Sequence, residues 1–331
     1  MTRVFSGIQP SGELHIGNYL GAVQNWVRLQ TQHDCLFSIV DLHAITQPYD
    51  AATLASLTLD MAVSLYAVGL DPEKCIVFVQ SHVVEHAELN WLFNAHGVAP
   101  LGELERQTQF KDKSQRQESV SAGLLNYPVL QAADVLLYKA SLVPVGEDQV
   151  QHLELMREIA RRWNARYGAS YFPEPQPLLT KTKRVLGLDG KAKMSKSLGN
   201  TIGLFESPEA IWEKLRPAAT DPARKTRKDP GTPEICNIFT IHQGFSPPDT
   251  ITEVAHKCRT AGWGCLDCKR VLADNMIATL APMRERANTL KREPATVLEK
   301  LRSGAGKARA LARQTMAEVW DRMGFLKAGE D

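Results

Sequence analysis

The sequence predicts an α/β fold: a doubly wound parallel sheet followed by a mostly α-helical C-terminal domain. Three observations support this prediction. Short apolar runs of strand length alternate with helical patterns over the first 200 residues. These runs are apolar along their whole length, as in parallel strands that are covered on both faces. After about residue 207 the strand signals fade and helical periodicity takes over.

The first strand leads into a glycine-containing loop, from Gly7 to Gly12, and a helical pattern begins at Ile16. This order of strand, loop and helix directs backbone N–H groups and a helix N-terminus toward a phosphate group. The two glycines have the spacing of a Walker A loop, but Glu13 and Leu14 stand where Lys and Ser/Thr are required. The dinucleotide pattern Gly-x-Gly-x-x-Gly is also missing. The loop therefore predicts a phosphate site of a different kind.

Strands and helices continue to alternate along the chain. Apolar runs of strand length cover 35–40, 75–79 and 142–145, and helical patterns cover 51–68, 85–95, 125–138 and 149–167. Prolines at positions 173, 175 and 177 predict a rigid connector, and later helical patterns cover 273–291 and 305–323. We therefore expect a catalytic domain over 1–200, with a polar insertion near 100–122, and a helical domain over 201–331.

Composition excludes several classes of protein. The 331 residues carry a formal net charge of +2, so any RNA contact must come from local basic patches. The chain has no run of 18 apolar residues and no signal peptide, so we expect neither a membrane span nor export. Its six cysteines fit a reducing cytoplasm with a metal site better than a disulfide framework. We therefore expect a cytoplasmic protein.

Two short motifs point to a family when they are taken together. His15-Ile16-Gly17-Asn18 opens the first helix, and Lys193-Met194-Ser195-Lys196-Ser197 follows far downstream. Each motif alone has an ordinary explanation, a helix cap for the first and a surface lysine loop for the second. In this order they resemble the two signatures of class I aminoacyl-tRNA synthetases. The form PSGxLHIGNYxGA resembles the tryptophan branch of that family.

The resemblance implies a Rossmann-like catalytic domain, a homodimer, and two half-reactions. Tryptophan and ATP would give tryptophanyl-adenylate and pyrophosphate, and tryptophan would then pass to the 3′ end of tRNA(Trp). The substrate's own carboxylate is the nucleophile, so the protein must align the reactants and stabilise negative charge. By resemblance, Mg²⁺ assists a catalytic set comprising Gln9, Lys113 in the insertion, Lys193, Ser195 and Lys196.

The resemblance also implies the residues that bind ATP. Gly146, Glu147 and Asp148 follow a strand, and ligands bind at the carboxyl ends of strands in such sheets. By resemblance, Asp148 holds the ribose, while Val185 and Met194 border the adenine. The full ATP-binding set is Gln9, Pro10, Ser11, His15, Gly17, Asn18, Gly146, Glu147, Asp148, Val185, Lys193, Met194, Ser195, Lys196 and Ser197.

Asp134 lies within an apolar helical run, LLNYPVLQAADVLLY. An isolated buried carboxylate is costly. Asp134 is therefore either exposed on the polar side of the helix, or it accepts a hydrogen bond from a substrate N–H in a pocket. The resemblance implies that Asp134 accepts the indole N–H, and that Tyr127 and Gln149 hold the amino group of tryptophan. The remaining pocket residues are Phe5, Gly7, Val40, His43 and Gln131. Gln131 departs from the family pattern, in which many bacterial members place Met.

Four cysteines gather late in the chain. Cys236, Cys258, Cys265 and Cys268 have the spacing Cys-x21-Cys-x6-Cys-x2-Cys, in which only the last pair has the knuckle spacing usual for structural zinc. The candidates are a 4Fe–4S cluster, zinc completed by His242 or His256, and free thiols. A cluster needs only four converging thiolates. Some members of the resembling family carry a 4Fe–4S cluster on a similar pattern, which implies a structural cluster in the tRNA-binding domain.

Two other functional classes stay open. One is a related enzyme on the same sheet, either a tyrosyl-tRNA synthetase or a small-molecule adenylyltransferase. The segments LQAADVLLY and VGEDQVQH favour tryptophan over these alternatives. The other is a synthetase-like RNA-binding or regulatory paralogue without aminoacylation activity. Gln9 and both signature lysines are present, which argues against a loss of activity.

Overall fold

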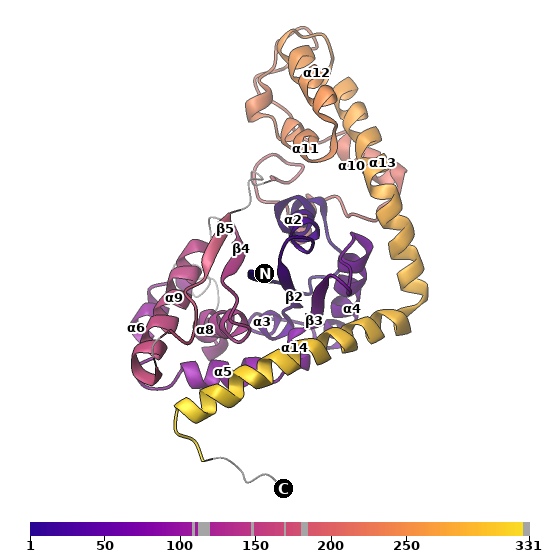
Figure 1. The fold of residues 1–331 in the computed structure, drawn as a ribbon. Coiled ribbons are helices and arrows are strands. Elements are labelled where there is room, and N and C mark those ends of the chain that lie inside the picture. The colour runs from indigo at the N-terminus through magenta and orange to yellow at the C-terminus, as the bar shows by residue number, and fades with distance from the viewer. Residues whose placement is uncertain (108–109, 112–119, 147–148, 169, 180–184, 327–331) are drawn as a thin grey trace.

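The computed structural model describes residues 1–107, 110–111, 120–146, 149–168, 170–179 and 185–326. Its centre is a five-stranded sheet in the order β3-β2-β1-β4-β5, shown in Figure 1. The strands, all parallel, are β1 (Arg3–Ile8), β2 (Asp34–Ile39), β3 (Cys75–Val79), β4 (Leu142–Val145) and β5 (Gln176–Leu179). The strand order reverses between β1 and β4, and ligands of doubly wound sheets bind at such a point. The predicted fold class is confirmed.

Helices cover both faces of the sheet. Successive residues of each strand point to opposite sides, so each face carries apolar side chains that have to be buried. Phe37 of β2 lies in one core cluster, with residues of the first helix, α4 and α13. Leu36 lies in the other cluster, with residues of α5, α8, α9 and α14. The helices between the strands are α3 (Asp41–Ala44), α4 (Ala51–Ala67), α5 (Glu85–Phe93), α6 (Leu101–Glu105), α8 (Ala122–Leu136) and α9 (Val150–Tyr167).

The helix that follows the glycine loop contains a π-helical turn. It consists of α1 (Ile16–Asn18), the π segment η1 (Tyr19–Val23) and α2 (Gln24–Leu29). The apolar period predicted one continuous helix from Ile16. This prediction is correct for the position of the helix, but the period does not reveal the π turn. π turns of this kind occur frequently beside functional sites. Trp26 anchors α2 to the sheet by stacking on Phe37, with ring centroids 4.7 Å apart.

The three prolines after α9 do not form a separate connector, because the last of them belongs to β5. Pro177 pairs with Val143 of β4. A proline is tolerated in this place because β5 is an edge strand, where one side of the backbone has no neighbouring strand to bond. The prediction of a rigid connector over 173–177 is therefore wrong for its C-terminal part.

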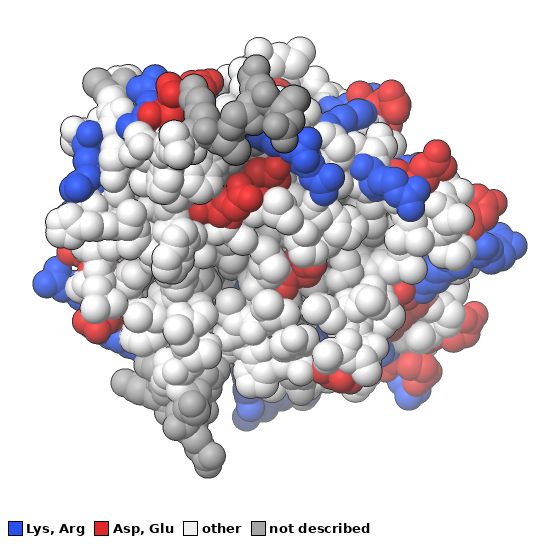
Figure 2. Space-filling model, turned by 90° about the horizontal axis from the view of Figure 1, so that it is seen from below, with Lys and Arg blue, Asp and Glu red and all other residues white. Residues whose placement is uncertain are grey.

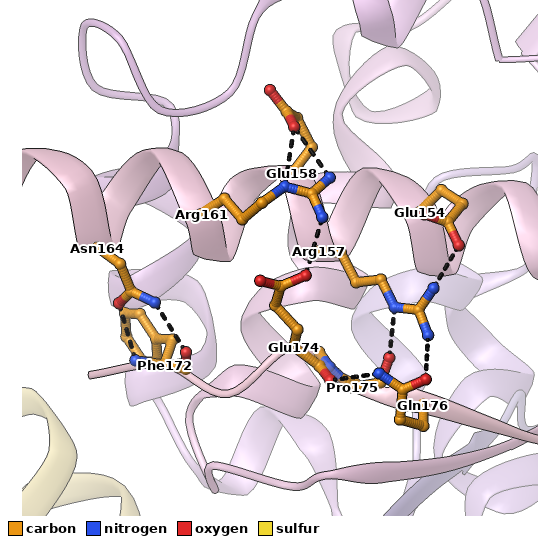
Figure 3. Close-up of polar contacts among 9 residues, drawn as sticks. All are labelled: Glu154, Arg157, Glu158, Arg161, Asn164, Phe172, Glu174, Pro175 and Gln176. Atoms are coloured by element: carbon orange, nitrogen blue, oxygen red, sulfur yellow. Dashed lines mark hydrogen bonds and ion pairs between the residues drawn. The ribbon is translucent and has the colours of Figure 1, made fainter. Parts of the chain in front are cut away.

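Side chains of α9 hold the segment that leads into β5, as Figure 3 shows. Arg157 donates to the Pro175 carbonyl and to Gln176 Oε1, each over 2.7 Å. Asn164 Nδ2 donates to the Phe172 carbonyl over 2.9 Å. The arginines also pair with the acidic residues Glu154, Glu158 and Glu174. The basic face of α9 is thus largely neutralised by carboxylates and has a structural role.

The C-terminal segment is helical, as predicted. It contains α10 (Pro208–Leu215), α11 (Asn237–Phe245), α12 (Pro248–Arg259), α13 (Cys265–Arg292) and α14 (Pro294–Arg322), with a short 3-10 turn at η5 (Pro233–Ile235). Another 3-10 turn, η4 (Lys196–Leu198), lies before this segment. Figure 1 shows α13 descending beside the sheet and α14 crossing below it. Both long helices share core clusters with the sheet, so the proposed division near residue 200 stays a prediction.

Two glycines on α14 show how closely that helix lies on the sheet. A Cβ built on Gly304 would stand 1.9 Å from the carbonyl oxygen of Val77 in β3, whereas one on Gly306 would meet open space. Only a residue without Cβ permits the approach at Gly304. Within the described ranges, no helix is both long enough and apolar enough to cross a membrane.

Candidate active site

The glycine loop ends in a helix cap formed by His15. The backbone N–H of Asn18 donates to His15 Nδ1, and the His15 N–H donates to Asn18 Oδ1, each over 3.3 Å. Burial, followed by the nearby charges of Lys196 and Lys193, lowers the pKa of His15 to about 4. His15 is therefore neutral at pH 7, and its Nδ1 can accept the hydrogen bond of the cap.

The lysine loop lies directly over the glycine loop. Lys196 Nζ donates to the Ser11 carbonyl over 2.7 Å. A Cβ built on Gly17 would stand 3.2 Å from Cβ of Met194, so glycine at this position permits the contact between the two signature motifs. Met194 is buried, whereas Lys193 is exposed. The structure therefore brings the two motifs together, although Asn18 and Lys193 are 175 positions apart in the sequence.

Asn200 anchors the lysine loop from below. Its Oδ1 accepts the Ser195 N–H over 2.8 Å, and Leu186 forms an isolated bridge with Lys193. Gly199 has a φ of +62°, a left-handed conformation that glycine adopts without strain. Asn200 therefore has a structural role in holding the lysine loop.

Asp134 lies on α8 and is buried at the centre of a polar cluster. His43 Nε2 lies 2.7 Å from Asp134 Oδ2, while Gln80 Nε2 and His86 Nδ1 each lie 2.6 Å from Oδ1. His86 Nε2 is in turn 2.8 Å from the Tyr138 hydroxyl. The alternative of an exposed Asp134 on a polar helix face is excluded, because only 2% of the residue is exposed.

The partners of Asp134 keep it ionised. Burial would raise the pKa of this carboxyl group, but the charge of His43 and the hydrogen bonds from His43 and His86 together outweigh burial. The pKa of Asp134 consequently lies well below its usual range. Gln80 and His86 were not predicted from the sequence. Gln80 directly follows β3 at the carboxyl edge of the sheet, which is the only local signal for its role.

Tyr127 and Gln149, which the sequence assigns to one pocket, are joined through a third residue. The Tyr127 hydroxyl lies 3.1 Å from His152 Nε2, and His152 Nδ1 lies 2.9 Å from Gln149 Oε1. Burial raises the pKa of Tyr127 to about 12, so its hydroxyl keeps its proton at neutral pH. His152 was also missed by sequence reasoning; it lies one helical turn after Gln149.

The remaining tryptophan-pocket candidates lie on β1, just after β2 and on α8. A Cβ built on Gly7 would stand 2.7 Å from Val40 Cγ1, so β1 and the end of β2 meet closely there. Gln131 is half-buried on α8. Phe5 is buried and stacks on Tyr138, with ring centroids 5.6 Å apart, so it lies beside the ring that contacts His86.

Val185 is buried in the core together with Met194, while Gln9 and Ser11 are exposed on the glycine loop beside the buried Pro10. Gly146 is exposed at the end of β4. Lys113, Glu147, Asp148 and the side chain of Ser197 lie outside the described residues. Their predicted roles therefore stay predictions.

The four late cysteines converge from the junction between η5 and α11, from α12 and from α13. All four line one cavity of about 20 Å³, together with Arg224. Burial raises the pKa of Cys268 to about 12, and the nearby Cys236, Cys258 and Cys265 add to the effect. Across the described ranges, however, no group of three or more His, Cys, Asp or Glu side chains is arranged to hold a metal ion. The predicted convergence is observed, and a metal site is not confirmed.

His242 and His256, the candidates for completing a zinc site, differ in position. His242 Nε2 lies 3.5 Å from Cys268 Sγ and 3.2 Å from its carbonyl oxygen. Burial lowers the pKa of His242 to about 4. His256 is exposed and does not line the cavity.

Comparisons with known proteins agree with this geometry. A family model described as tRNA synthetases class I (W and Y) matches residues 1–281. The tryptophan–tRNA ligase of Deinococcus radiodurans is 55% identical over 332 residues, which cover 99% of this chain and 100% of that protein. The tryptophan–tRNA ligase of Caldanaerobacter subterraneus is 45% identical, with coverage of 98% and 99%.

A solved structure gives the same result in three dimensions. The tryptophanyl-tRNA synthetase of Campylobacter jejuni, complexed with ADP and tryptophan, superposes with a TM-score of 0.86. The two chains are 37% identical, and the match covers 98% of this chain and 100% of that one. The tyrosyl-tRNA synthetase of Archaeoglobus fulgidus matches with a lower TM-score of 0.66. The chain therefore belongs to the class I tRNA synthetases, and within them to the tryptophan–tRNA ligases.

Proposed function

We propose that the chain carries out both half-reactions of tryptophan–tRNA ligation at the carboxyl edge of its sheet. One observation carries the proposal: Lys196 reaches the Ser11 carbonyl over 2.7 Å, which joins the lysine loop to the glycine loop. ATP phosphates bound by the glycine loop would therefore lie beside the signature lysines. The buried carboxylate of Asp134 belongs to the same edge, because its partners His43 and Gln80 follow β2 and β3.

The adenylation step needs placement and charge stabilisation. The carboxylate of tryptophan attacks the α-phosphorus of ATP, the bond to the bridging oxygen breaks, and pyrophosphate leaves with the displaced charge. Lys193, Lys196 and Lys113 would stabilise this charge, with hydrogen bonds from Ser195 and Gln9. Mg²⁺ on the ATP phosphates would supply further positive charge. No protein nucleophile takes part, since the substrate brings its own.

We assign the rest of the ATP site to neighbouring residues. Gly17 and Asn18 lie at the start of α1. Backbone N–H groups at the start of a helix favour the binding of phosphate. Pro10, His15 and Gly146 would shape the same surface, and Asp148 would accept from the ribose hydroxyls with Glu147 beside it. Val185 and Met194 would support the adenine from the core side, because both are buried.

Tryptophan would bind between α8 and the ends of the first strands. Asp134 would accept the indole N–H, which tyrosine and phenylalanine cannot donate from that position, and a buried charge left unpaired disfavours them. Tyr127 and Gln149 would hold the amino group, supported by His152.

Transfer to tRNA(Trp) then tests the complete function. With ATP, purified protein should charge a tRNA(Trp) transcript with labelled tryptophan, and charging by a different amino acid alone would contradict the proposal.

We also propose that the active form is a homodimer of this chain. Apolar side chains are exposed on and before α5 and α6, and the three most prominent are Trp91 at 76%, Leu101 at 58% and Val84 at 57%. A second copy of the chain would cover them. Figure 2 views the molecule from the side where α5 and α14 lie in Figure 1, and most of the middle of that face is white, with a few acidic residues among residues other than Lys, Arg, Asp and Glu. The six free cysteines suit a cytoplasmic location, where translation takes place.

We propose that the cysteine cavity holds a 4Fe–4S cluster rather than zinc. Four thiolates are the ligands that such a cluster needs, and the four late cysteines line one cavity. Arg224 Nη1 lies 4.0 Å from Cys258 Sγ and would balance the negative charge of a thiolate-bound cluster. Cys236, Cys258, Cys265 and Cys268 would hold it as a structural element.

Metal analysis distinguishes the three candidates. Protein purified without oxygen should be brown and contain close to four irons per chain, and Cys265→Ser should lose both colour and iron. Cys35→Ala is the matched control, because Cys35 lies in β2 and should leave the iron content unchanged. The Cys265 variant should impair tRNA charging more than tryptophan activation. Stoichiometric zinc, or protein free of metal, would contradict the cluster.

A further inference from the structure

Asp134 is surrounded by more hydrogen-bond donors than a simple substrate acceptor requires. A carboxylate oxygen accepts about two hydrogen bonds. Oδ1 already has Gln80 Nε2 and His86 Nδ1, each at 2.6 Å, whereas Oδ2 has only His43 Nε2, at 2.7 Å. Oδ1 is therefore saturated, and one acceptor position remains on Oδ2.

The orientation of Gln80 is fixed by the backbone of α3. Its Oε1 accepts the N–H of Leu42 over 3.1 Å. A backbone N–H can only donate, so the amide oxygen must face Leu42 and the amide nitrogen must face Asp134. Asp41 strengthens this link between α3 and the turn after β3, because its Oδ1 accepts the Ser81 N–H over 2.9 Å. Gln80 is fully buried, so water does not compete for the amide.

The orientation of His86 is fixed by Tyr138. Both side chains are almost completely buried, and the Tyr138 hydroxyl lies 2.8 Å from His86 Nε2. When this hydroxyl donates to Nε2, the ring hydrogen is on Nδ1 and points at Asp134. The segment from Gln80 to His86 is also held from outside by α14. Arg309 donates to the His82 carbonyl, and Arg313 lies 3.4 Å from Glu85.

We propose that Gln80 and His86 are positioning residues for tryptophan selection. They occupy Oδ1 of Asp134 and prevent the carboxylate from turning, so that Oδ2 alone faces the indole N–H. This inference rests on the proposed role of Asp134. Without either donor, Oδ1 becomes a second acceptor and the carboxylate loses its fixed direction. Recognition of the N–H then weakens, although the pocket keeps its apolar shape.

The test compares tryptophan with the analogue in which sulfur replaces the indole N–H. Amino-acid-dependent ATP–pyrophosphate exchange gives kcat/KM for each, and their ratio measures recognition of the N–H. Gln80→Leu and His86→Leu should each lower this ratio about tenfold, the effect of losing one buried hydrogen bond to a charged group. The loss should appear in KM for tryptophan more than in kcat, because the N–H is held before and during reaction.

Two conservative variants separate hydrogen bonding from folding. His86→Asn keeps a donor near the place of Nδ1 and should keep the ratio within about threefold of the unaltered protein. His86→Gln keeps a group near Nε2 instead and should lower the ratio as leucine does. Equal ratios in these two variants would overturn the proposal, even where the leucine variants do not fold.

Asp134→Ala separates this inference from the proposed function. It should bring the ratio of kcat/KM for tryptophan over the sulfur analogue close to one. If it does so while the Gln80 and His86 variants keep the full ratio, the positioning role is wrong and the role of Asp134 stands. If Asp134→Ala itself leaves the ratio unchanged, the assignment of Asp134 to the indole N–H is wrong.

Discussion

Lys196 is the residue that links the two loops of the active site. Its ammonium group donates to the Ser11 carbonyl over 2.7 Å and lies 3.2 Å from the position of a Cβ on Gly12. Burial lowers the pKa of Lys196, while the charges of Glu13 and Asp60 oppose that effect. The side chain is thus held at the loop where phosphates are proposed to bind.

Replacing Lys196 by Ala should slow adenylate formation by roughly 10²–10³, the scale for losing one preorganised charge donor. Tryptophan binding should change little, because the charge that Lys196 stabilises develops only during reaction. Single-turnover formation of adenylate and equilibrium binding of tryptophan measure the two effects. Lys191 is an exposed lysine just before this loop. Lys191→Ala should change neither the rate of adenylate formation nor the binding of tryptophan. Equal rates in both variants would remove Lys196 from the catalytic set.

Some predicted site residues carry a local signal in the sequence, whereas Tyr127 and Gln149 were assigned by resemblance alone. His15 and Lys196 belong to motifs, and Asp134 is a charge within an apolar helix. Gln80, His86 and His152 act through tertiary contacts, which no spacing in the sequence reports. Gln80, for example, meets Asp134 only because the turn after β3 lies against α8.

At the scale of elements, α14 is attached to the sheet by close approach as well as by apolar burial. Gly304 permits contact with the backbone of β3, and Lys307 and Arg309 donate to carbonyl groups of Pro72 and His82. Several lysines and arginines of α14 are therefore engaged with the protein itself. This distribution indicates that α14 supports the sheet.

Two glycines on α14 provide a matched pair for testing this attachment. Gly304→Ala should destabilise the protein by about 1–3 kcal/mol, because a methyl group cannot fit against Val77 without a backbone shift. Gly306→Ala, two residues further along the same helix, should stabilise it by about 0.5–1 kcal/mol through helix propensity. Denaturant unfolding measures both. Stabilisation of the same size in the two variants would show that α14 does not approach β3 closely.

The elements themselves were largely predictable from periodicity. The strands β3 and β4 lie where the apolar runs predicted them, as do the main parts of α4, α5, α8 and α9. The π turn within the first helix was not predictable, because it leaves the apolar period almost unchanged. Strand β5 was missed because its prolines suit an edge strand only when a neighbouring strand is present. Both differences come from context that a local pattern lacks.

At the scale of the whole molecule, the proposed dimer depends on Trp91. Trp91→Glu should shift the protein from about twice the chain mass of 36.7 kDa to a single chain at micromolar concentration, because a charge would enter an apolar interface. Leu298→Glu is the control, since Leu298 is an exposed apolar residue on α14. Sedimentation velocity gives the masses. A monomeric unaltered protein, or dissociation by the control alone, would place the interface elsewhere or exclude it.

The residues proposed for activation and the cysteine cavity lie in different parts of the molecule. The residues proposed for adenylation lie on the loops of the sheet, while the cysteine cavity lies in the lobe formed by α11, α12 and the start of α13, at the top of Figure 1. Activation of tryptophan should accordingly proceed without tRNA. Selection of the amino acid should depend on Asp134 and its neighbours, and not on the distant lobe.

ATP–pyrophosphate exchange over the full set of twenty amino acids tests the central claim most directly. Purified protein, without tRNA, should catalyse exchange with tryptophan, and kcat/KM for tryptophan should exceed that for tyrosine or phenylalanine by about 10⁴ or more, as expected of a site built around one polar group of its substrate. Preference for tyrosine, or no exchange with any amino acid while the protein is folded, would contradict the account.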